Sequence, residues 1–301
     1  MAGSMKDIKL RIKSVESTMQ ITKAMELVAS SKLRHARNRV EKSRPYFEVL
    51  QKTLSDIAVN NRDFTSRYTK KREVKRTCYI VIAGDRGLAG GYNSNMFKLM
   101  DAELAGKDHC VLPLGKKALE HYERLGSEIV TKEFYEVGDV SVSDCFAVAK
   151  LISKGFLAGE FDEIYLGYTQ FISMLTQEAT FVPVLPFEAL KEEALEETEQ
   201  AAQEAVPTAN AEEKPTARDV ILYEPSSEEV FNAIIPEYIA GMIYGAVSES
   251  VASELAARRT AMDSATRNAK DMIANLNLYY NRARQASITQ EITEIVAGAE
   301  A

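Results

Sequence analysis

The 301-residue sequence predicts an α/β fold in which a long antiparallel coiled coil of the N- and C-terminal helices accompanies a central Rossmann-like α/β domain. Three observations predict it. Residues 5–60 contain one proline and no glycine, residues 237–301 contain no proline, and residues 75–187 alternate between β-rich and helical runs. Unbroken runs favour long helices, and the alternation favours a mostly parallel sheet covered by helices. The chain is therefore expected to comprise an N-terminal long helix, the central α/β domain, an acidic linker or insertion and a C-terminal long helix, at residues 1–60, 75–187, 188–219 and 220–301 respectively.

The N-terminal helix is predicted from apolar residues that recur at steps of three and four, as an amphipathic helix requires. These residues are Ile8, Ile12, Val15 and Met19, followed after a change of phase by Ile21, Met25 and Val28. Pro45 is expected to kink or break the helix. Because residues 1–76 carry 19 basic and 8 acidic side chains, this helix should present a basic surface.

The central domain begins at Lys75 with a β-rich run, which a glycine-rich turn, AGDRGLAGGYN, connects to a helix. Further strands are predicted in HCVLPLG, SEIVTKEFYEV and EIYLGYTQFIS, and further helices in KKALEHYERLG and at residues 143–157. Two prolines in TFVPVLPF place that segment at an edge strand or a strand end, since proline cannot donate to a sheet ladder.

The C-terminal helix is predicted from a capping sequence at Ser226 or Ser227 to about residue 297. Its seam is expected at two series of residues seven apart, which are Met262, Ala269, Leu276 and Ala283, and Ala265, Met272, Tyr279 and Ala286. At about 1.5 Å per residue this helix would be roughly 100 Å long, whereas a compact chain of this size is about 50 Å across. The two long helices should therefore pair with each other. After Ala286 the apolar positions shift to Ile288, Ile292 and Ile295, so the last turns should pack against another protein.

The residue types exclude several classes of protein. The N-terminus has no apolar run typical of a signal peptide, and no membrane span is expected. Three cysteines, Cys78, Cys110 and Cys145, form no CxxC pair, which disfavours a disulfide framework or a zinc site. His35, His109 and His121 have no acidic partner at metal-ligand spacing. The sequence predicts no catalytic residues, no metal and no cofactor.

The chain could instead bind a nucleotide or a nucleic acid. A coiled-coil adaptor with a nucleotide-binding α/β domain would use the glycine-rich turn, but GxGxxG and GxxxxGK[ST] are both absent, so the glycines favour a tight turn in which Asp85 and Arg86 pair locally or face a partner. A nucleic-acid clamp would use the basic N-terminal helix, which lacks clustered aromatic residues for base stacking. We therefore expect no nucleic acid as a partner.

Six blocks identify a family. The C-terminal run ITQEITEIVAGAEA resembles the signature I-T-x-E-x-x-[DE]-x-x-x-G-A of the gamma subunit of F-type ATP synthase, bacterial type. The other blocks that resemble this family are QITKAMELVASSKLR, DRGLAGGYNSN, LYEP, SELAARRTAMDSAT and YNRARQAS, and all six occur in the family's order.

The resemblance implies a noncatalytic central-stalk rotor subunit that couples transmembrane ion flow to ATP synthesis, with the catalytic chemistry in its partners. Those partners are the alpha and beta subunits of the catalytic ring, the epsilon subunit and the membrane c-ring, at the cytoplasmic face of the bacterial cell membrane. By matching motif positions, the implied contacts with the alpha/beta ring are Met25, Arg258, Arg284, Gln285, Thr289 and Glu291. The implied contacts with the c-ring or epsilon subunit are Tyr223 and Glu224.

Overall fold

The computed structural model describes residues 5–60, 66–70, 72–133, 136–138, 140–187 and 224–299. The predicted acidic segment at residues 188–219 and the candidate contact Tyr223 lie outside them. The chain divides into two compact units. Unit 1 comprises Met1–Leu33, Leu88–Gly90 and Leu255–Ala301, and unit 2 comprises Arg34–Gly87 and Gly91–Glu254. Two helices belong to both units, α1 (Met5–Asn60) and α6 (Ser227–Ala299).

Unit 2 is built around a five-stranded sheet with the order β3-β2-β1-β4-β5. Its strands are β1 (Thr77–Ile82), β2 (His109–Leu114), β3 (Glu128–Ile129), β4 (Glu163–Phe171) and β5 (Gln177–Leu185). All neighbours pair in parallel except β4 and β5, which are antiparallel. The Rossmann-like topology is therefore confirmed, and the proline-bearing segment forms the edge strand β5, as its prolines predicted.

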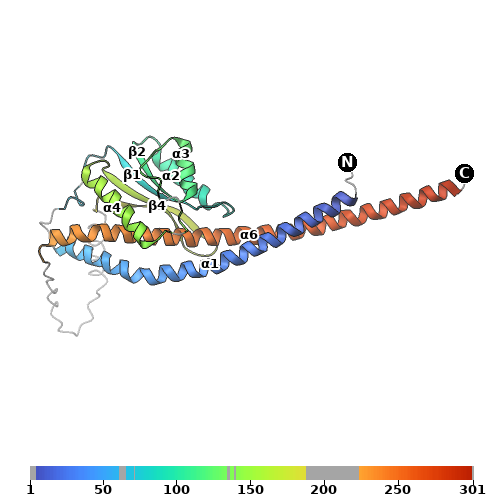
Figure 1. Cartoon of the computed structure of the whole chain (residues 1–301), viewed down its shortest axis with the longest axis horizontal. Helices are drawn as coiled ribbons and strands as arrows, with labels where there is room; N and C mark the ends of the chain where they lie inside the picture. Colours follow the sequence, from blue (N-terminus) through green and yellow to red (C-terminus); the bar gives the residue numbers. More distant parts are fainter. Residues whose placement is uncertain are drawn as a thin grey trace, which may run out of the picture. The chain divides into compact units, whose positions relative to one another are not determined.

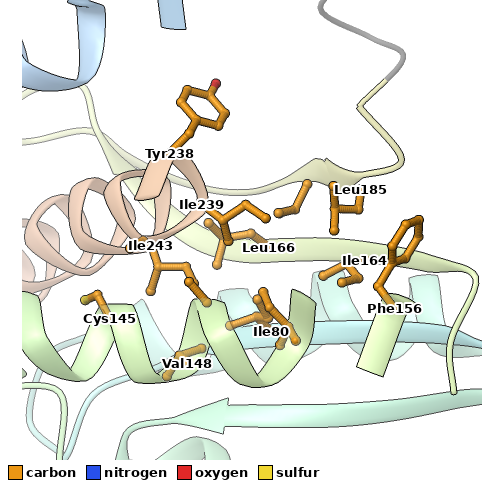
Figure 2. Close-up of a cluster of buried hydrophobic side chains, with 14 of the residues drawn as sticks. Ile80, Cys145, Val148, Phe156, Ile164, Leu166, Leu185, Tyr238, Ile239 and Ile243 are labelled. Carbon is orange, nitrogen blue, oxygen red and sulfur yellow. The ribbon is translucent and has the colours of Figure 1, made fainter. Parts of the chain in front are cut away.

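Helices cover both faces of this sheet (Figure 1). They are α2 (Tyr92–Leu104), α3 (Lys116–Leu125) and α4 (Val142–Ala158), together with the unit 2 parts of α1 and α6. Side chains alternate along β1, so Ile80 joins the apolar cluster with α4 and α6, whereas Tyr79 joins the cluster with α2 and α3. Figure 2 shows the first cluster, in which Ile239 and Ile243 of α6 lie beside Leu166 of β4.

The apolar character of α6 follows from this packing. An 18-residue window in α6 has a mean hydropathy of 1.4, which satisfies a membrane-span test by length and composition alone, and half of that window is buried in the fold. Phe231, Ile235 and Ile239 are fully buried in unit 2. Packing into the core of unit 2 therefore accounts for the buried half of this segment.

Pro45 lies inside α1, so the helix does not break there, and the kink that the sequence allowed stays a prediction. The exposed position of Pro45 lets water bond the carbonyl group that loses its helical partner. The long strand expected in SEIVTKEFYEV is reduced to Glu128–Ile129. Further along, the backbone N–H of Val137 donates to the Asp85 carboxylate (2.9 Å) rather than to a neighbouring strand.

Unit 1 contains an antiparallel coiled coil of α1 and α6. The hydroxyl oxygens of Thr22 and Thr266 lie 2.8 Å apart and fix its register. One predicted series on α6, beginning at Met262, faces α1, but its companion series is Thr266, Ile273 and Tyr280. The predicted companions Met272 and Tyr279 are 45% and 60% exposed. The error arose because Thr266 occupies a seam position that an apolar pattern cannot reveal.

The threonine pair gives a test of the register. We expect Thr22→Val to lower the free energy of unfolding by about 1 kcal/mol, the usual net worth of a buried hydrogen bond. Thr22→Val combined with Thr266→Val should cost less than the sum of the single changes, because the bond between the two hydroxyls can be lost only once. After a single change the remaining hydroxyl still has a backbone acceptor on its own helix, the Met19 or the Met262 carbonyl oxygen. Urea denaturation of the three variants measures this coupling.

Thr18→Val is the matched control, since Thr18 is exposed and its hydroxyl donates only to the Ser14 carbonyl oxygen (3.1 Å). Its effect should stay within about 0.5 kcal/mol. Strict additivity of the Thr22 and Thr266 changes would contradict the described register.

Candidate functional site

The last turns of α6 form an exposed apolar tip, which we define as residues 284–296. Counting back from the Thr22–Thr266 pair places Met5, where the described part of α1 begins, opposite Ala283. Figure 1 shows α6 continuing past this end of α1. Four apolar side chains of the tip are 47–72% exposed, namely Ile288, Ile292, Ile295 and Val296. The predicted need for a further neighbour at these turns therefore agrees with their exposure.

Four of the sequence-predicted contact residues lie on this tip. With 3.6 residues per turn, Arg284 and Glu291 share one helix face with Ile288. Gln285 and Thr289 lie on the adjacent face, where the Thr289 hydroxyl donates to the Gln285 carbonyl oxygen (2.9 Å). All four side chains are exposed. With Glu294, the tip thus combines an apolar surface with one cationic and two anionic groups, which suits contact with a mixed protein surface.

Met25 and Arg258 are placed elsewhere in unit 1. Both are partly buried, unlike the residues of the tip. The register puts Met25 opposite Asp263, so Met25 and Arg258 lie about five residues apart along the coiled coil, roughly 8 Å. The six predicted ring contacts therefore fall into two groups, the tip and this partly buried pair.

Glu224 is exposed and lies just before the start of α6. The Ser226 hydroxyl accepts a hydrogen bond from the Glu229 backbone N–H (3.2 Å), so the predicted helix start is confirmed with Ser226 as its cap. This places Glu224 two residues before the cap.

Sequence reasoning missed an apolar strip on α1. Ile21, Leu27 and Val28 are 56–59% exposed in unit 1, although two of them were assigned to the seam. The structure instead continues the seam through Thr22 and Ala29, which are buried. The apparent change of phase after Met19 was therefore the signal of a second apolar surface. These three exposed apolar residues on a basic helix add to the candidate interaction surface.

The Asp85 carboxylate of the glycine-rich turn binds backbone groups of two other segments. It accepts hydrogen bonds from the backbone N–H groups of Val137 (2.9 Å), Gly138 (3.0 Å) and Lys116 (3.2 Å). Lys116 is the first residue of α3, so Asp85 lies at the N-terminus of α3, whereas the turn itself leads into α2. Asp85 is therefore paired within the fold, with residues that are distant in the sequence.

The side chain of His121 contributes to packing inside the fold. His121 lies beside an acidic residue of another helix, since its Nε2 lies 2.9 Å from Asp101 Oδ2. Its ring also stacks on Phe97 with centroids 4.1 Å apart. Among the described residues, no three histidine, cysteine, aspartate or glutamate side chains could hold a metal ion together. These contacts assign His121 to the α2–α3 packing.

The cysteines are likewise buried and free. Cys78 and Cys110, which are far apart in the sequence, are register partners on β1 and β2. Burial raises the pKa of Cys145 to about 12, so this thiol stays protonated at neutral pH.

Comparison with known proteins gives a consistent result along the whole chain. A family model described as ATP synthase matches residues 4–301. The chain is 45% identical over 299 residues to the ATP synthase gamma chain of Ruminococcus albus, covering 97% of this chain and 96% of that protein. It is 46% identical over 304 residues to the gamma chain of Alkaliphilus metalliredigens, with 100% and 99% covered. It is 43% identical over 313 residues to the sodium ion specific gamma chain of Acetobacterium woodii, with 100% and 99% covered.

Solved structures show the same fold. The structure of the central stalk and c-ring of the Tetrahymena thermophila mitochondrial ATP synthase contains a chain with a TM-score of 0.55 and 25% identity, covering 81% of this chain and 99% of that one. A chain of the Euglena gracilis mitochondrial ATP synthase, in rotational state 3, gives a TM-score of 0.64 at 18% identity, with 100% and 95% covered.

Proposed function

Because the chain belongs to the gamma-chain family of ATP synthases, we propose that its exposed tip and coiled coil are the surfaces that turn within the alpha and beta subunits of the catalytic ring. The chain is the central-stalk rotor subunit of F-type ATP synthase, and it is noncatalytic by itself. It acts within the membrane-bound ATP synthase complex, coupling ion flow to ATP synthesis.

The observation that carries the proposed contact with the ring is the exposed tip. Ile288, Ile292 and Ile295 are 47–72% exposed, which is costly for a helix that ends in water. Apolar side chains contact a surrounding surface without fixed direction, so they allow turning while excluding water. A ring of subunits around the tip would cover these side chains at every angle of rotation.

Coupling also requires that the rotor present different faces. Arg284 and Glu291 place a positive and a negative charge on one face of the tip, so this face differs chemically from the rest of the helix surface. Each ring subunit would therefore meet a different surface at each angle, and its preference among conformations would shift by the difference in contact energy. The basic residues of α1 would add an attraction to acidic loops that salt weakens.

The finer assignments follow from the same role. We assign Arg284, Gln285, Thr289 and Glu291 to the ring contact at the tip, and Met25 and Arg258 to a second ring contact. Tyr223 and Glu224 are assigned to the epsilon subunit or the membrane c-ring, at the cytoplasmic face of the cell membrane. The segments 1–60 and 220–301 would serve as the shaft, 75–187 as the domain that joins the other rotor subunits, and 188–219 as an accessory linker.

Arg284 gives a specific test of the ring contact. We expect Arg284→Ala to weaken binding to an alpha/beta complex about tenfold or more, because a hydrogen bond to a charged group contributes about 1.5–3 kcal/mol. The affinity of Arg284→Lys should lie between those of the unchanged chain and of Arg284→Ala, since lysine keeps the charge but loses the bidentate geometry. Titration of the labelled chain into purified alpha/beta complex measures both affinities.

Arg282→Ala is the matched control, since Arg282 is an equally exposed arginine on the same helix but points to another side. Its affinity should be close to that of the unchanged chain. Equal losses for the two alanine variants would show that only net charge matters, and they would remove Arg284 from the contact.

The proposed assembly is tested by co-expression with alpha and beta subunits from a related bacterium. The chain should elute with both subunits as one ATPase complex at physiological salt. Elution of the chain alone, beside an intact alpha/beta complex, would contradict the proposal.

A further inference from the structure

The pairing between β1 and β4 in unit 2 stops before the end of β4. β1 pairs with β4 only as far as Val81 and Gly167, whereas β4 continues to Phe171. Beyond Gly167, β4 is paired on its other side by β5, with Thr169 opposite Ala179. In an antiparallel pair the N–H and C=O of one residue point to the same side. The backbone groups of β4 that face the end of β1 therefore need other partners.

Two serines of α6 supply these partners at Thr169. The Thr169 N–H donates to the Ser250 hydroxyl (3.1 Å), and the Thr169 carbonyl oxygen accepts from the Ser253 hydroxyl (3.1 Å). Both bonds are buried, because Ser250 and Ser253 have no exposed surface and Thr169 is 3% exposed. We call these three residues the Thr169 junction. Since Ser250 and Ser253 are three residues apart on one helix face, α6 continues the ladder where β1 stops.

The junction lies among other buried polar groups. The phenol of Tyr92, at the start of α2, lies beside Ser250 and Thr169, and burial together with the charge of Glu254 raises its pKa. Glu254 is 9% exposed and approaches Gly84 so closely that a Cβ atom there would lie 2.7 Å from its Oε1. Close packing around the junction leaves little room for water to replace its two hydrogen bonds.

The other contacts of α6 with the sheet are of a different kind. Ile235, Ile239 and Ile243 pack into the apolar cluster, and Figure 2 shows the last two facing β4 and α4. Apolar contacts resist rotation through close packing but have no preferred direction. Hydrogen bonds, by contrast, weaken steeply when their angles change. The junction therefore adds a directional restraint on the rotation of α6 to the packing of the apolar contacts.

We propose that the Thr169 junction is a rotational lock between α6 and the sheet, and that Ser250 and Ser253 are positioning residues for torque transfer. The proposal rests on the rotor role. α6, like α1, is shared by both units, so torque between unit 2 and the coiled coil passes along these two helices. The lock keeps the angle of α6 on the sheet fixed while the helix is under load, so that rotation of one unit is delivered to the other without slippage.

The test uses the assembled ATP synthase in membrane vesicles, in which ATP hydrolysis and ATP-driven ion pumping are both measured. Ser250→Ala combined with Ser253→Ala removes both hydroxyl groups and leaves the apolar contacts in place. We expect the number of ions pumped per ATP hydrolysed to fall at least twofold, while ATP hydrolysis itself is retained. Retained hydrolysis separates a failure of the lock from a failure of the rotor assignment, because the latter would abolish complex formation.

Ser248→Ala is the matched control. Ser248 lies on the same helix and is 8% exposed, and within the described chain it has no hydrogen bond to the sheet. The control should keep the coupling ratio of the unchanged enzyme. A double variant with the coupling ratio of the Ser248 control would overturn the proposal.

A cross-link tests the lock if the double alanine variant fails to assemble. Thr169→Cys and Ser250→Cys introduce two thiols at the junction, which an oxidant such as diamide joins by removing two electrons and two protons. A lock that stays closed during turnover predicts that the cross-linked enzyme hydrolyses ATP and pumps ions as fast as the same enzyme after reduction. Loss of turnover on cross-linking, restored by dithiothreitol, would show that α6 must move on the sheet and would overturn the proposal.

Discussion

Replacing Gly115 with alanine is expected to destabilise unit 2 strongly. Gly115 has a φ of +102°, and a Cβ atom built there would lie 2.0 Å from the Ala83 carbonyl oxygen. That oxygen cannot retreat easily, because the Ala83 N–H donates to the Leu114 carbonyl oxygen (2.9 Å) next to Gly115. Backbone strain of about 1–3 kcal/mol and a similar cost for displacing the neighbouring strand suggest a loss of about 4 kcal/mol.

Gly106→Ala provides the matched control for this prediction. Gly106 also has a positive φ, +75°, but nothing lies within 4 Å of its added Cβ atom. This variant should cost only about 1 kcal/mol. Thermal or urea unfolding of the two variants measures the difference, and equal stabilities would refute the argument from the close approach of Ala83.

Deleting residues 288–301 is expected to leave the fold intact and to impair the complex severely. The described side chains of this segment are exposed, so their removal should change the free energy of unfolding by less than about 0.5 kcal/mol. Binding to the alpha/beta ring should weaken at least about tenfold, because each isoleucine that the ring buries contributes on the order of 1.5–3 kcal/mol before the costs of association. Unfolding of the free chain and titration of alpha/beta complex measure the two effects separately.

A shorter truncation controls for the loss of the chain end. Removing only residues 298–301 keeps all the isoleucines of the tip and should leave the affinity nearly unchanged. If the truncation at residue 288 also bound and supported coupled ATP synthesis normally, the tip would not be a ring contact.

The elements of this fold were largely predictable because local signals specify them. Glycine and proline mark the turns, and β-rich runs mark four of the strands at nearly their observed bounds. The exposure of the tip was also foreseen, since Ile288 and Ile292 follow a break in the heptad pattern. In both cases the information lies within about 20 residues.

What the sequence could not reveal depends on register between distant segments. The seam error at Met272 arose because Thr266 faces Thr22 across the coiled coil. Cys78 and Cys110 lie at neighbouring positions of β1 and β2 because of the strand register, which only the assembled sheet determines. The same holds for the Thr169 junction, in which β4 meets α6 through an unremarkable threonine and two serines. Polar residues in the seam of a coiled coil, or where the pairing of two strands ends, do not show up in the periodic pattern of apolar residues.

The rotor assignment is tested most directly by watching the chain turn. The alpha/beta ring of an assembled complex is fixed to a surface, and a bead is attached to an exposed cysteine introduced in unit 2, for example by Leu125→Cys, since Leu125 is 57% exposed. On addition of ATP the bead should rotate repeatedly in one direction, and rotation should stop when hydrolysis is inhibited. Sustained ATP hydrolysis by complexes that contain this chain, with no directional rotation of the bead, would contradict the account.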